Sequence, residues 1–414
     1  MMDKYTERTE KILARINELA GYSEDKHALT RTFGSPAFVE ASGKVVSWMK
    51  EAGLQTSIDN IGNIRGRFMA DSQPSKTFII ASHIDSVVNA GKFDGPLGVV
   101  MGLDLVANLI TQQSSIPFNI ELIAFSDEEG VRFHSTFLGS KVIAGTFEKD
   151  LLLKKDTSGI FLQEVIRAIG SNPDRLSEDA IPSSELLGYF EIHIEQGPVL
   201  YEKNIPAAIV TGIAGQRRIE LIFKGIAGHA GTVPMDMRSD ALCAAAACIL
   251  EIEKLAMAQK DKVVATVGKL DIRNAASNVI PGDVVCSLDL RSVDETILEA
   301  ASKDLQKIGE EVCRKRSVDF KWNLIQATKP VACDTRFNYL LQEAIEEAGY
   351  KTIRLVSGAG HDAVAIAGIA PVCMLFVRCF KGISHNPLED VEPGDIKASL
   401  KIAEKFIHKL ITQY

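Results

Sequence analysis

Apolar side chains recur at two different spacings in the first third of the chain. Residues 5–19 and 36–52 carry them at helical spacing, and Ser35 stands as a cap before a proline at the first helical position. Two short apolar runs, 77–81 and 119–125, have strand character and enclose a predicted helix at 98–110. This strand–helix–strand order is typical of an α/β domain with parallel strands.

Polar residues follow each of the predicted strands. The run 77–81 leads into Ser82-His83, and 119–125 leads into Ser126-Asp127-Glu128-Glu129. Two later apolar runs, 188–193 and 371–377, lead to His193 and to the loop that holds His385. Ligands of open parallel α/β sheets gather at the carboxyl ends of the strands. We therefore predict that four strand ends supply one site.

The pattern changes between about residues 216 and 326. A half-buried strand at 217–225 is followed by a helix at 240–260, strands at 263–271 and 284–290, a helix at 294–316 and a strand at 318–325. This βαββαβ order is that of a ferredoxin-like layer. We expect residues 1–215 and 327–414 to form a catalytic domain, and 216–326 to form an inserted α+β lid or dimerisation domain.

Composition narrows the class of protein. The 414 residues, 46% hydrophobic and 24% charged, are ordinary for a globular chain of two domains. A net charge of -8 without a basic block disfavours nucleic acid. A charged N-terminus lacks a secretory signal, and the apolar runs are too short for a bilayer. Seven scattered cysteines suit a reducing compartment, so we expect a cytoplasmic protein without membrane contact.

Histidine and acidic residues in the strand-end motifs are ligands for Zn²⁺ or Mn²⁺. Two cations a few ångströms apart need a shared anionic ligand, and Asp94, in the glycine-flanked Phe93-Asp94-Gly95 turn, is the natural bridge. We expect His83 and His193 to complete one metal site. Glu129 and His385 are expected to complete the other.

Two more acids have predicted roles beside these ligands. Glu128, next to a ligand, is the candidate general base. Asp85, two residues after His83, is placed to hold the other ring nitrogen of that histidine. A single strand-end histidine is usually structural and adjacent glutamates usually form a solvated turn. Only the combination of these motifs favours a metal centre.

The motifs also carry a resemblance to a known group of enzymes. The chain resembles the amidase/hydantoinase/carbamoylase group of aminoacylase-like metallohydrolases over nearly its whole length. The stretches that carry the resemblance are 82–95, 127–133, 137–140, His193-Ile-Glu-Gln-Gly197, 228–235, 278–281, Ser357-Gly-Ala-Gly-His-Asp362 and 382–387.

The resemblance implies a mixed-sheet, metallopeptidase-like catalytic domain and a homodimer with two divalent ions in each subunit. It implies cleavage of a ureido or carbamoyl group beside a carboxylate. His229 would stabilise the oxyanion from the partner subunit, and Asn278 and Arg291 would hold the substrate carboxylate. The rest of the pocket would be lined by Gln196, Gly360 and His361.

The choice of substrate depends on Gln216 and Arg217. This pair is similar to that of allantoate amidohydrolases, which release ureidoglycine, ammonia and carbon dioxide, and its polar groups would suit a second ureido arm. An N-carbamoyl-L-amino-acid amidohydrolase would share every metal ligand and stays the alternative. A peptidase or deacylase of the wider clan and a non-catalytic scaffold of the same fold are less favoured. The ligand types leave Mn²⁺ and Zn²⁺ both open.

Overall fold

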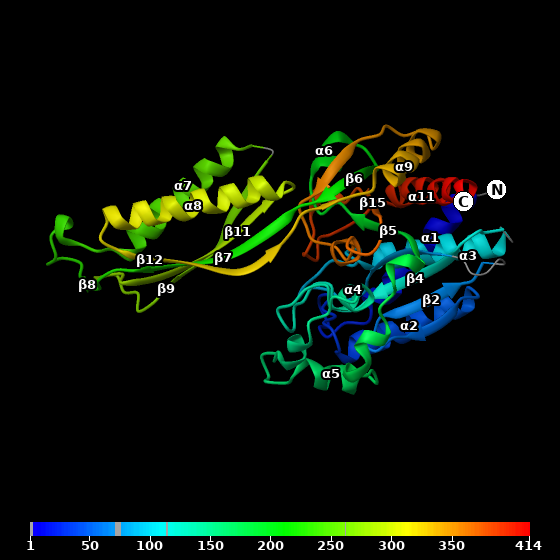
Figure 1. Cartoon of the computed structure of the whole chain (residues 1–414), viewed down its shortest axis with the longest axis horizontal. Coiled ribbons are helices and arrows are strands. Elements are labelled where there is room, and N and C mark those ends of the chain that lie inside the picture. Colours follow the sequence, from blue (N-terminus) through cyan, green and yellow to red (C-terminus); the bar gives the residue numbers. More distant parts are fainter. Residues whose placement is uncertain (1–2, 71–75, 113–114, 261) are drawn as a thin grey trace. The chain divides into compact units, whose positions relative to one another are not determined.

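The computed structural model describes residues 3–70, 76–112, 115–260 and 262–414 (Figure 1). The chain divides into two compact units. Unit 1 comprises the residues up to Thr211 and those from Ala332 onward, and unit 2 comprises Gly212–Val331. The expected insertion, 216–326, falls within unit 2.

Unit 1 is built on a mixed sheet. In the described residues the strand order is β1 (Gln55–Ile58), β2 (Ile64–Phe68), β4 (Asn119–Phe125), β3 (Thr77–His83), β5 (Leu186–Ile194), β15 (Val372–Val377), β6 (Ala207–Ile213) and β13 (Val331–Ala332), with β14 (Arg354–Ser357) also paired to β6. The central strands β4, β3, β5 and β15 are parallel, whereas β2 and β6 run antiparallel to their neighbours. The mixed α/β fold is therefore confirmed.

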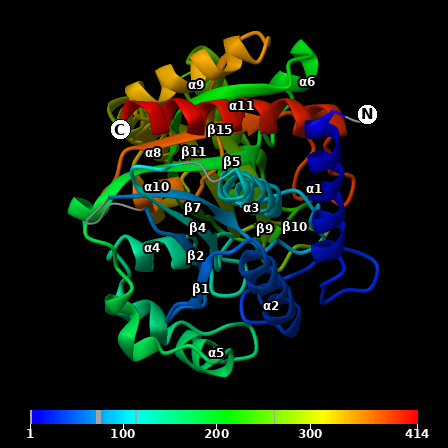
Figure 2. The same cartoon turned by 90° about the vertical axis from the view of Figure 1, so that its right-hand side faces the viewer.

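Helices cover both faces of this sheet (Figure 2). They are α1 (Lys4–Ala20), α2 (Pro36–Glu51), α3 (Pro96–Thr111), α4 (Leu138–Ile143), α5 (Leu162–Ala168), α6 (Val199–Lys203), α9 (Thr335–Glu347), α10 (Ala363–Ile366) and α11 (Pro393–Gln413), with 3₁₀ turns at Lys149–Leu153, Pro173–Glu178, Ser183–Glu185 and Phe380–Gly382. No helix in the described part of the chain combines the length and apolarity that a membrane crossing needs.

Side-chain alternation assigns these helices to faces. Phe78 on β3 contacts the rings of Phe337 on α9 and Phe406 on α11, and Phe190 on β5 contacts Phe406 as well. Glu191, the next residue on β5, points to the opposite face and accepts a hydrogen bond from the first residue of α10. The aromatic rings of β3 and β5 thus pack against α9 and α11, and Glu191 lies on the side of α10.

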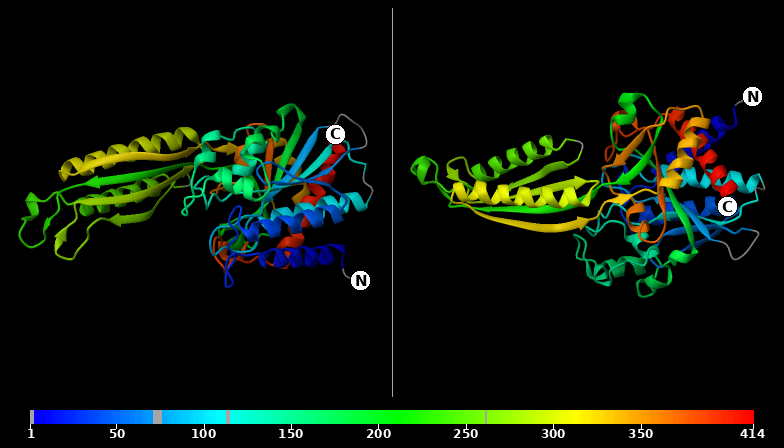
Figure 3. Two further views of the ribbon diagram at one scale, coloured as in Figure 1. Left: turned by 90° about the horizontal axis from the view of Figure 1, so that it is seen from below. Right: turned by 45° about the horizontal axis from the view of Figure 1, so that its top comes forward.

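Unit 2 has the ferredoxin-like arrangement that the pattern predicts. Its sheet has the order β12 (Asp319–Thr328), β7 (Gly215–Lys224), β11 (Asp283–Ser292), β9 (Val264–Ile272), all antiparallel. The helices α7 (Ala241–Ala258) and α8 (Glu295–Lys315) cover one face (Figure 3). The sequence pattern did not predict the short pair β8 (Gly228–His229) and β10 (Val279–Ile280), or the 3₁₀ turn Met235–Met237.

Candidate metal centre

The site lies at the carboxyl ends of the parallel strands, as predicted. His83 is the last residue of β3 and is in register with Phe125, the last residue of β4. His193 lies near the end of β5, in register with Phe376 of β15. The loops after these strands therefore open at the same edge of the sheet, where Glu129 and His385 follow β4 and β15.

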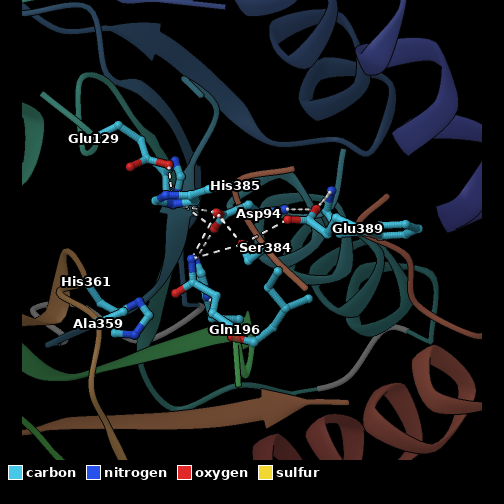
Figure 4. A network of polar contacts seen from close by, with 12 residues as sticks. Asp94, Glu129, Gln196, Ala359, His361, Ser384, His385 and Glu389 are labelled. Carbon is cyan, nitrogen blue, oxygen red and sulfur yellow. Dashed lines mark hydrogen bonds and ion pairs between the residues drawn. The ribbon is translucent and has the colours of Figure 1, made fainter. Parts of the chain in front are cut away.

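Asp94 is the residue on which three histidines converge, and Figure 4 shows its contact with His385. Its Oδ1 lies 3.1 Å from Nε2 of His193 and 3.9 Å from Nε2 of His83. Its Oδ2 lies 3.2 Å from Nε2 of His385, and that same nitrogen is 3.3 Å from Oε1 of Glu129. Each carboxylate oxygen of Asp94 thus faces a different set of partners.

These distances define two groups of metal-binding atoms that share one residue. His83, Asp94 and His193 form one group, and Asp94, Glu129 and His385 form the other, with the ligand atoms of each group within 4.8 Å of one another. Imidazole nitrogen and carboxylate oxygen are the donors that Zn²⁺ and Mn²⁺ accept. The residues present therefore fit a pair of divalent cations bridged by Asp94.

Glu128 is not set apart from these ligands. His83, Glu128 and Glu129 form a third group of donor atoms within 4.8 Å of one another. Burial raises the pKa of the Glu128 carboxyl well above its usual range, and His83 acts in the opposite direction. Glu128 is therefore a buried carboxyl group in contact with the metal-binding groups, which is where a proton-transfer group is needed.

Charges in the site are strongly coupled. Burial would raise the pKa of Asp94, but hydrogen bonds with His193 and His385 hold it well below its usual range. The same contacts, to Asp94 and then to Glu129, raise the pKa of His385 to about 10. In the described residues, only histidines lie within ion-pair distance of Asp85, Asp94 and Glu129. Such a concentration of buried anionic groups favours cations.

Asp85 lies beside His83 and makes further contacts that the sequence did not indicate. Nδ1 of His83 lies 3.1 Å from the backbone carbonyl oxygen of Asp85 and 3.6 Å from its carboxylate. The two carboxylate oxygens also accept hydrogen bonds from the backbone N–H groups of Glu128 and Glu129, each at 3.1 Å. Asp85 therefore fixes the turn that carries the candidate base and a candidate ligand.

Several site loops contain backbone conformations that L-residues rarely adopt. Asp127, Gln196 and His385 have φ values of 53°, 56° and 54°. Gly95, directly after Asp94, has φ 84° and ψ -63°, and a Cβ there would lie 2.5 Å from the ring of His83. Backbone strain of this kind persists only where the surrounding contacts fix it, and it gathers at functional sites.

The other predicted residues of unit 1 surround the centre unequally. Gln196 donates a hydrogen bond from Nε2 to Oδ2 of Asp94 at 2.9 Å. The ring of His361 packs edge-on against that of His193, with centroids 4.5 Å apart, and its Nε2 lies 2.7 Å from Oγ of Ser357. Gly360 has no polar side chain to offer, and a Cβ there would lie 2.6 Å from the ring of Phe137. A side chain at position 360 would therefore collide with Phe137.

The predicted substrate residues of unit 2 form two pairs. His229 on β8 and Val279 on β10 are register partners. Beside them, the backbone carbonyl oxygen of Asn278 accepts a hydrogen bond from the backbone N–H of Ala230. Gln216 and Arg291 are cross-strand partners on β7 and β11. Asp289 ties this second pair together.

The contacts of Asp289 join both predicted substrate groups. It accepts from Nε2 of Gln216 at 2.6 Å and from Nε and Nη2 of Arg291 at 2.8 and 3.0 Å.

Arg217 does not act with Gln216 as expected. Neighbouring residues of a strand point to opposite faces, so Arg217 faces the helices while Gln216 shares the other face with Arg291. Arg217 donates from Nη2 to Glu295 at the start of α8, at 2.7 Å. Gln216 and Arg217 therefore cannot bind the same arm of a substrate, because their side chains lie on opposite faces of the sheet.

Two residues of the site were given no role from the sequence. Oγ of Ser384 lies 3.0 Å from Oδ2 of Asp94 and 3.0 Å from Oε2 of Glu389. Burial raises the pKa of Glu389 to about 7, with the Asp94 charge adding to the effect. Glu389 is four residues after His385. That spacing alone does not show that the chain turns back and brings Glu389 to the Phe93 and Asp94 amides.

Comparisons with known proteins agree with this geometry. The family model described as peptidase family M20/M25/M40 matches residues 79–409. A probable allantoate deiminase of Oryza sativa subsp. japonica is 38% identical, covering 95% of this chain and 86% of the relative. An N-carbamoyl-L-amino-acid amidohydrolase of Pseudomonas sp. (strain NS671) is 37% identical, covering 99% of this chain and 100% of the relative. A solved amidase of the hydantoinase/carbamoylase family from Burkholderia multivorans has a TM-score of 0.89 at 31% identity, covering 96% of this chain and 97% of that one. These similarities confirm the resemblance seen in the motifs, and the chain belongs to the peptidase family M20/M25/M40.

Proposed function

We propose that this protein is a two-metal amidohydrolase that hydrolyses the ureido group of allantoate. The observation that carries the proposal is the sharing of Asp94 between two groups of metal-binding atoms. Addition of one water to a ureido group breaks its C–N bonds and yields ammonia, carbon dioxide and a primary amine, here ureidoglycine. Relatives named allantoate deiminase, 37 to 38% identical over most of the chain, support this substrate.

The metal ligands in this proposal are His83, Asp94 and His193 for one ion, and Asp94, Glu129 and His385 for the other. Bound Zn²⁺ or Mn²⁺ would polarise the ureido carbonyl and lower the pKa of a water molecule.

The chain's own proton chemistry falls to Glu128. Its buried carboxylate accepts a proton from the attacking water and returns it to the leaving nitrogen. The hydrogen bonds from the Glu128 and Glu129 amides to Asp85 hold the turn that carries this carboxylate.

Substrate-binding roles are proposed for residues of each unit, taken separately. Arg291 binds the substrate carboxylate through its planar fork of N–H donors, and Gln216, on the same face of its sheet, meets the second ureido arm. His229 and Asn278 serve the oxyanion and the carboxylate. Gln196 and His361 line the pocket at the metal centre.

The test compares substrates directly. Protein freed of metal and reconstituted with Mn²⁺ or Zn²⁺ is incubated with allantoate or with N-carbamoyl-L-amino acids, and released ammonia is measured. We expect metal-dependent ammonia release that is fastest with allantoate. Metal-loaded protein that releases no ammonia from any of these compounds would overturn the proposed function.

N-carbamoyl-L-amino-acid hydrolysis is the second candidate. It is favoured by the relative from Pseudomonas sp., which matches this chain from end to end at 37% identity. The two reactions share the ureido chemistry and the substrate carboxylate. They differ in the group on the adjacent carbon, so a faster rate on any carbamoyl amino acid assigns this second activity.

We include a homodimer and a lid role for unit 2 in the proposal. Apolar side chains are exposed on unit 2, among them Leu250 and Met257 on α7 and Val264 on β9. Large exposed apolar side chains grouped on one unit support a protein–protein contact. Light scattering coupled to size exclusion tests the oligomeric state, and a monomer at micromolar concentration would contradict a dimer.

A further inference from the structure

Glu389 holds the two halves of the metal centre together through backbone and side-chain contacts. Its Oε1 accepts hydrogen bonds from the backbone N–H of Phe93 at 2.8 Å and of Asp94 at 3.1 Å. Its Oε2 lies 3.0 Å from the hydroxyl of Ser384, the residue before His385. One carboxylate thus joins the turn of the shared ligand to the loop of a second ligand, across almost 300 residues of sequence (Figure 4).

The contact is built into the fold. Glu389 is only 4% exposed, and a Cβ on Gly91 would lie 2.2 Å from its Cδ. The loop itself is closed by hydrogen bonds from the amide of Leu388 to Oδ1 of Asn386 and from the amide of Glu389 to the carbonyl of Asn386. The carboxylate therefore has a fixed position rather than a choice of solvent-exposed rotamers.

The two ligand loops need such a connection for a physical reason. Asp94 must present one oxygen to each group, and that requires a fixed backbone under it. His385 is half exposed and sits at φ 54°, so its position depends on surrounding contacts that fix its backbone. Hydrogen-bond partners that orient metal ligands typically contribute about 10- to 100-fold to metal affinity.

We propose that Glu389 is a positioning residue that couples Asp94 to the His385 loop and thereby sets the affinity of the centre for divalent cations. This inference rests on the proposed metal site. Glu389 belongs to none of the groups of metal-binding atoms found in the described residues, and it acts through the Phe93 and Asp94 amides and through Ser384. Its function is to accept hydrogen bonds, so a neutral acceptor of the same shape can replace much of it.

The test titrates metal-free protein with MnCl₂ or ZnCl₂ in a calorimeter. We expect Glu389→Ala to lose about 10- to 100-fold in affinity for at least one ion. Gly91→Ala should give a similar loss, because its new methyl group displaces the Glu389 side chain while every ligand is unchanged. Glu389→Gln should lose less than Glu389→Ala, because its carbonyl oxygen can accept from both amides and its NH₂ can donate to Ser384.

A matched control separates positioning from general destabilisation. Glu404 is an equally buried glutamate, 5% exposed, whose hydrogen-bond and ion-pair partners in the described residues are Lys4, Tyr5, Arg8 and Asn108. Glu404→Ala should lower the melting temperature and leave metal affinity unchanged. Melting of each metal-free variant shows which proteins are folded before titration.

The outcomes distinguish the inference from the proposed function. Wild-type affinity in both Glu389→Ala and Gly91→Ala, or an equal loss in Glu404→Ala, overturns the role of Glu389. Wild-type protein that binds metal but releases no ammonia overturns the proposed function alone. Wild-type protein that binds neither Mn²⁺ nor Zn²⁺ overturns both.

Discussion

Replacement of Gly95 by alanine tests how closely the shared ligand and its neighbour are packed. The glycine has φ 84° and ψ -63°, a conformation that costs an L-residue about 1–3 kcal/mol. The new Cβ would also lie 2.5 Å from the His83 ring, and overpacking of a buried site costs about 1–3 kcal/mol. The combined penalty, about 2–6 kcal/mol, is a large part of the total stability of a domain. We expect either a much lower melting temperature or a displaced His83 with weak metal binding.

Gly349 provides the matched control for this substitution. Its φ is 88°, and a Cβ there would meet nothing within 4 Å. Gly349→Ala therefore introduces backbone strain without a clash and should cost only about 1–2 kcal/mol. The assay is thermal melting of both variants with and without Mn²⁺ or Zn²⁺, followed by calorimetric metal titration. Equal melting temperatures and equal metal affinities in Gly95→Ala and Gly349→Ala would refute the packing argument.

Three further predictions address proton transfer, substrate binding and pH. Glu128→Gln should keep both metals in a calorimetric titration but lose about 10²- to 10⁴-fold in the rate of ammonia release, and an unchanged rate would exclude a base role. Asp289→Ala should raise KM for allantoate more than it lowers kcat, because Gln216 and Arg291 lose their common partner; an effect confined to kcat would contradict this. Burial would raise the pKa of Glu404, but Arg8 holds it below the ordinary value of 4.5. Its stabilising effect is therefore present above pH 4.5 and is lost as pH falls through the lowered value, so urea unfolding of wild type and Glu404→Gln should converge in acid.

The sequence predicts the elements of this fold well because its signals are local. The strand 119–125 and the helix that begins at Pro36 agree with β4 and with the start of α2, since an apolar run and a capped proline act over a few residues. The convergence of ligands also follows from sequence, because parallel strands end at one edge. That rule brings His83, Glu129, His193 and His385 to one edge without any distance information.

What the sequence does not show is which atom of a residue makes the contact. Asp85 contacts His83, but its carboxylate also accepts from the amides of Glu128 and Glu129, which the spacing of these residues does not show. Gln216 and Arg217 are neighbours that look like one recognition pair, yet the pleat separates them. Glu389 accepts a hydrogen bond from the backbone N–H of Asp94, a contact between residues far apart in the sequence. Each of these depends on backbone direction in the folded protein, which residue spacing does not record.

The order of strands in unit 1 has a consequence for synthesis on the ribosome. Strand β15 lies between β5 and β6, although β5 and most of β6 precede unit 2 in the chain and β15 follows it. During translation, the edges of β5 and β6 that pair with β15 therefore stay without this partner until more than 370 residues have been made. Unit 2 is continuous and can fold first. His385 follows β15, so a nascent chain acquires the complete set of proposed metal ligands only after β15 has been made.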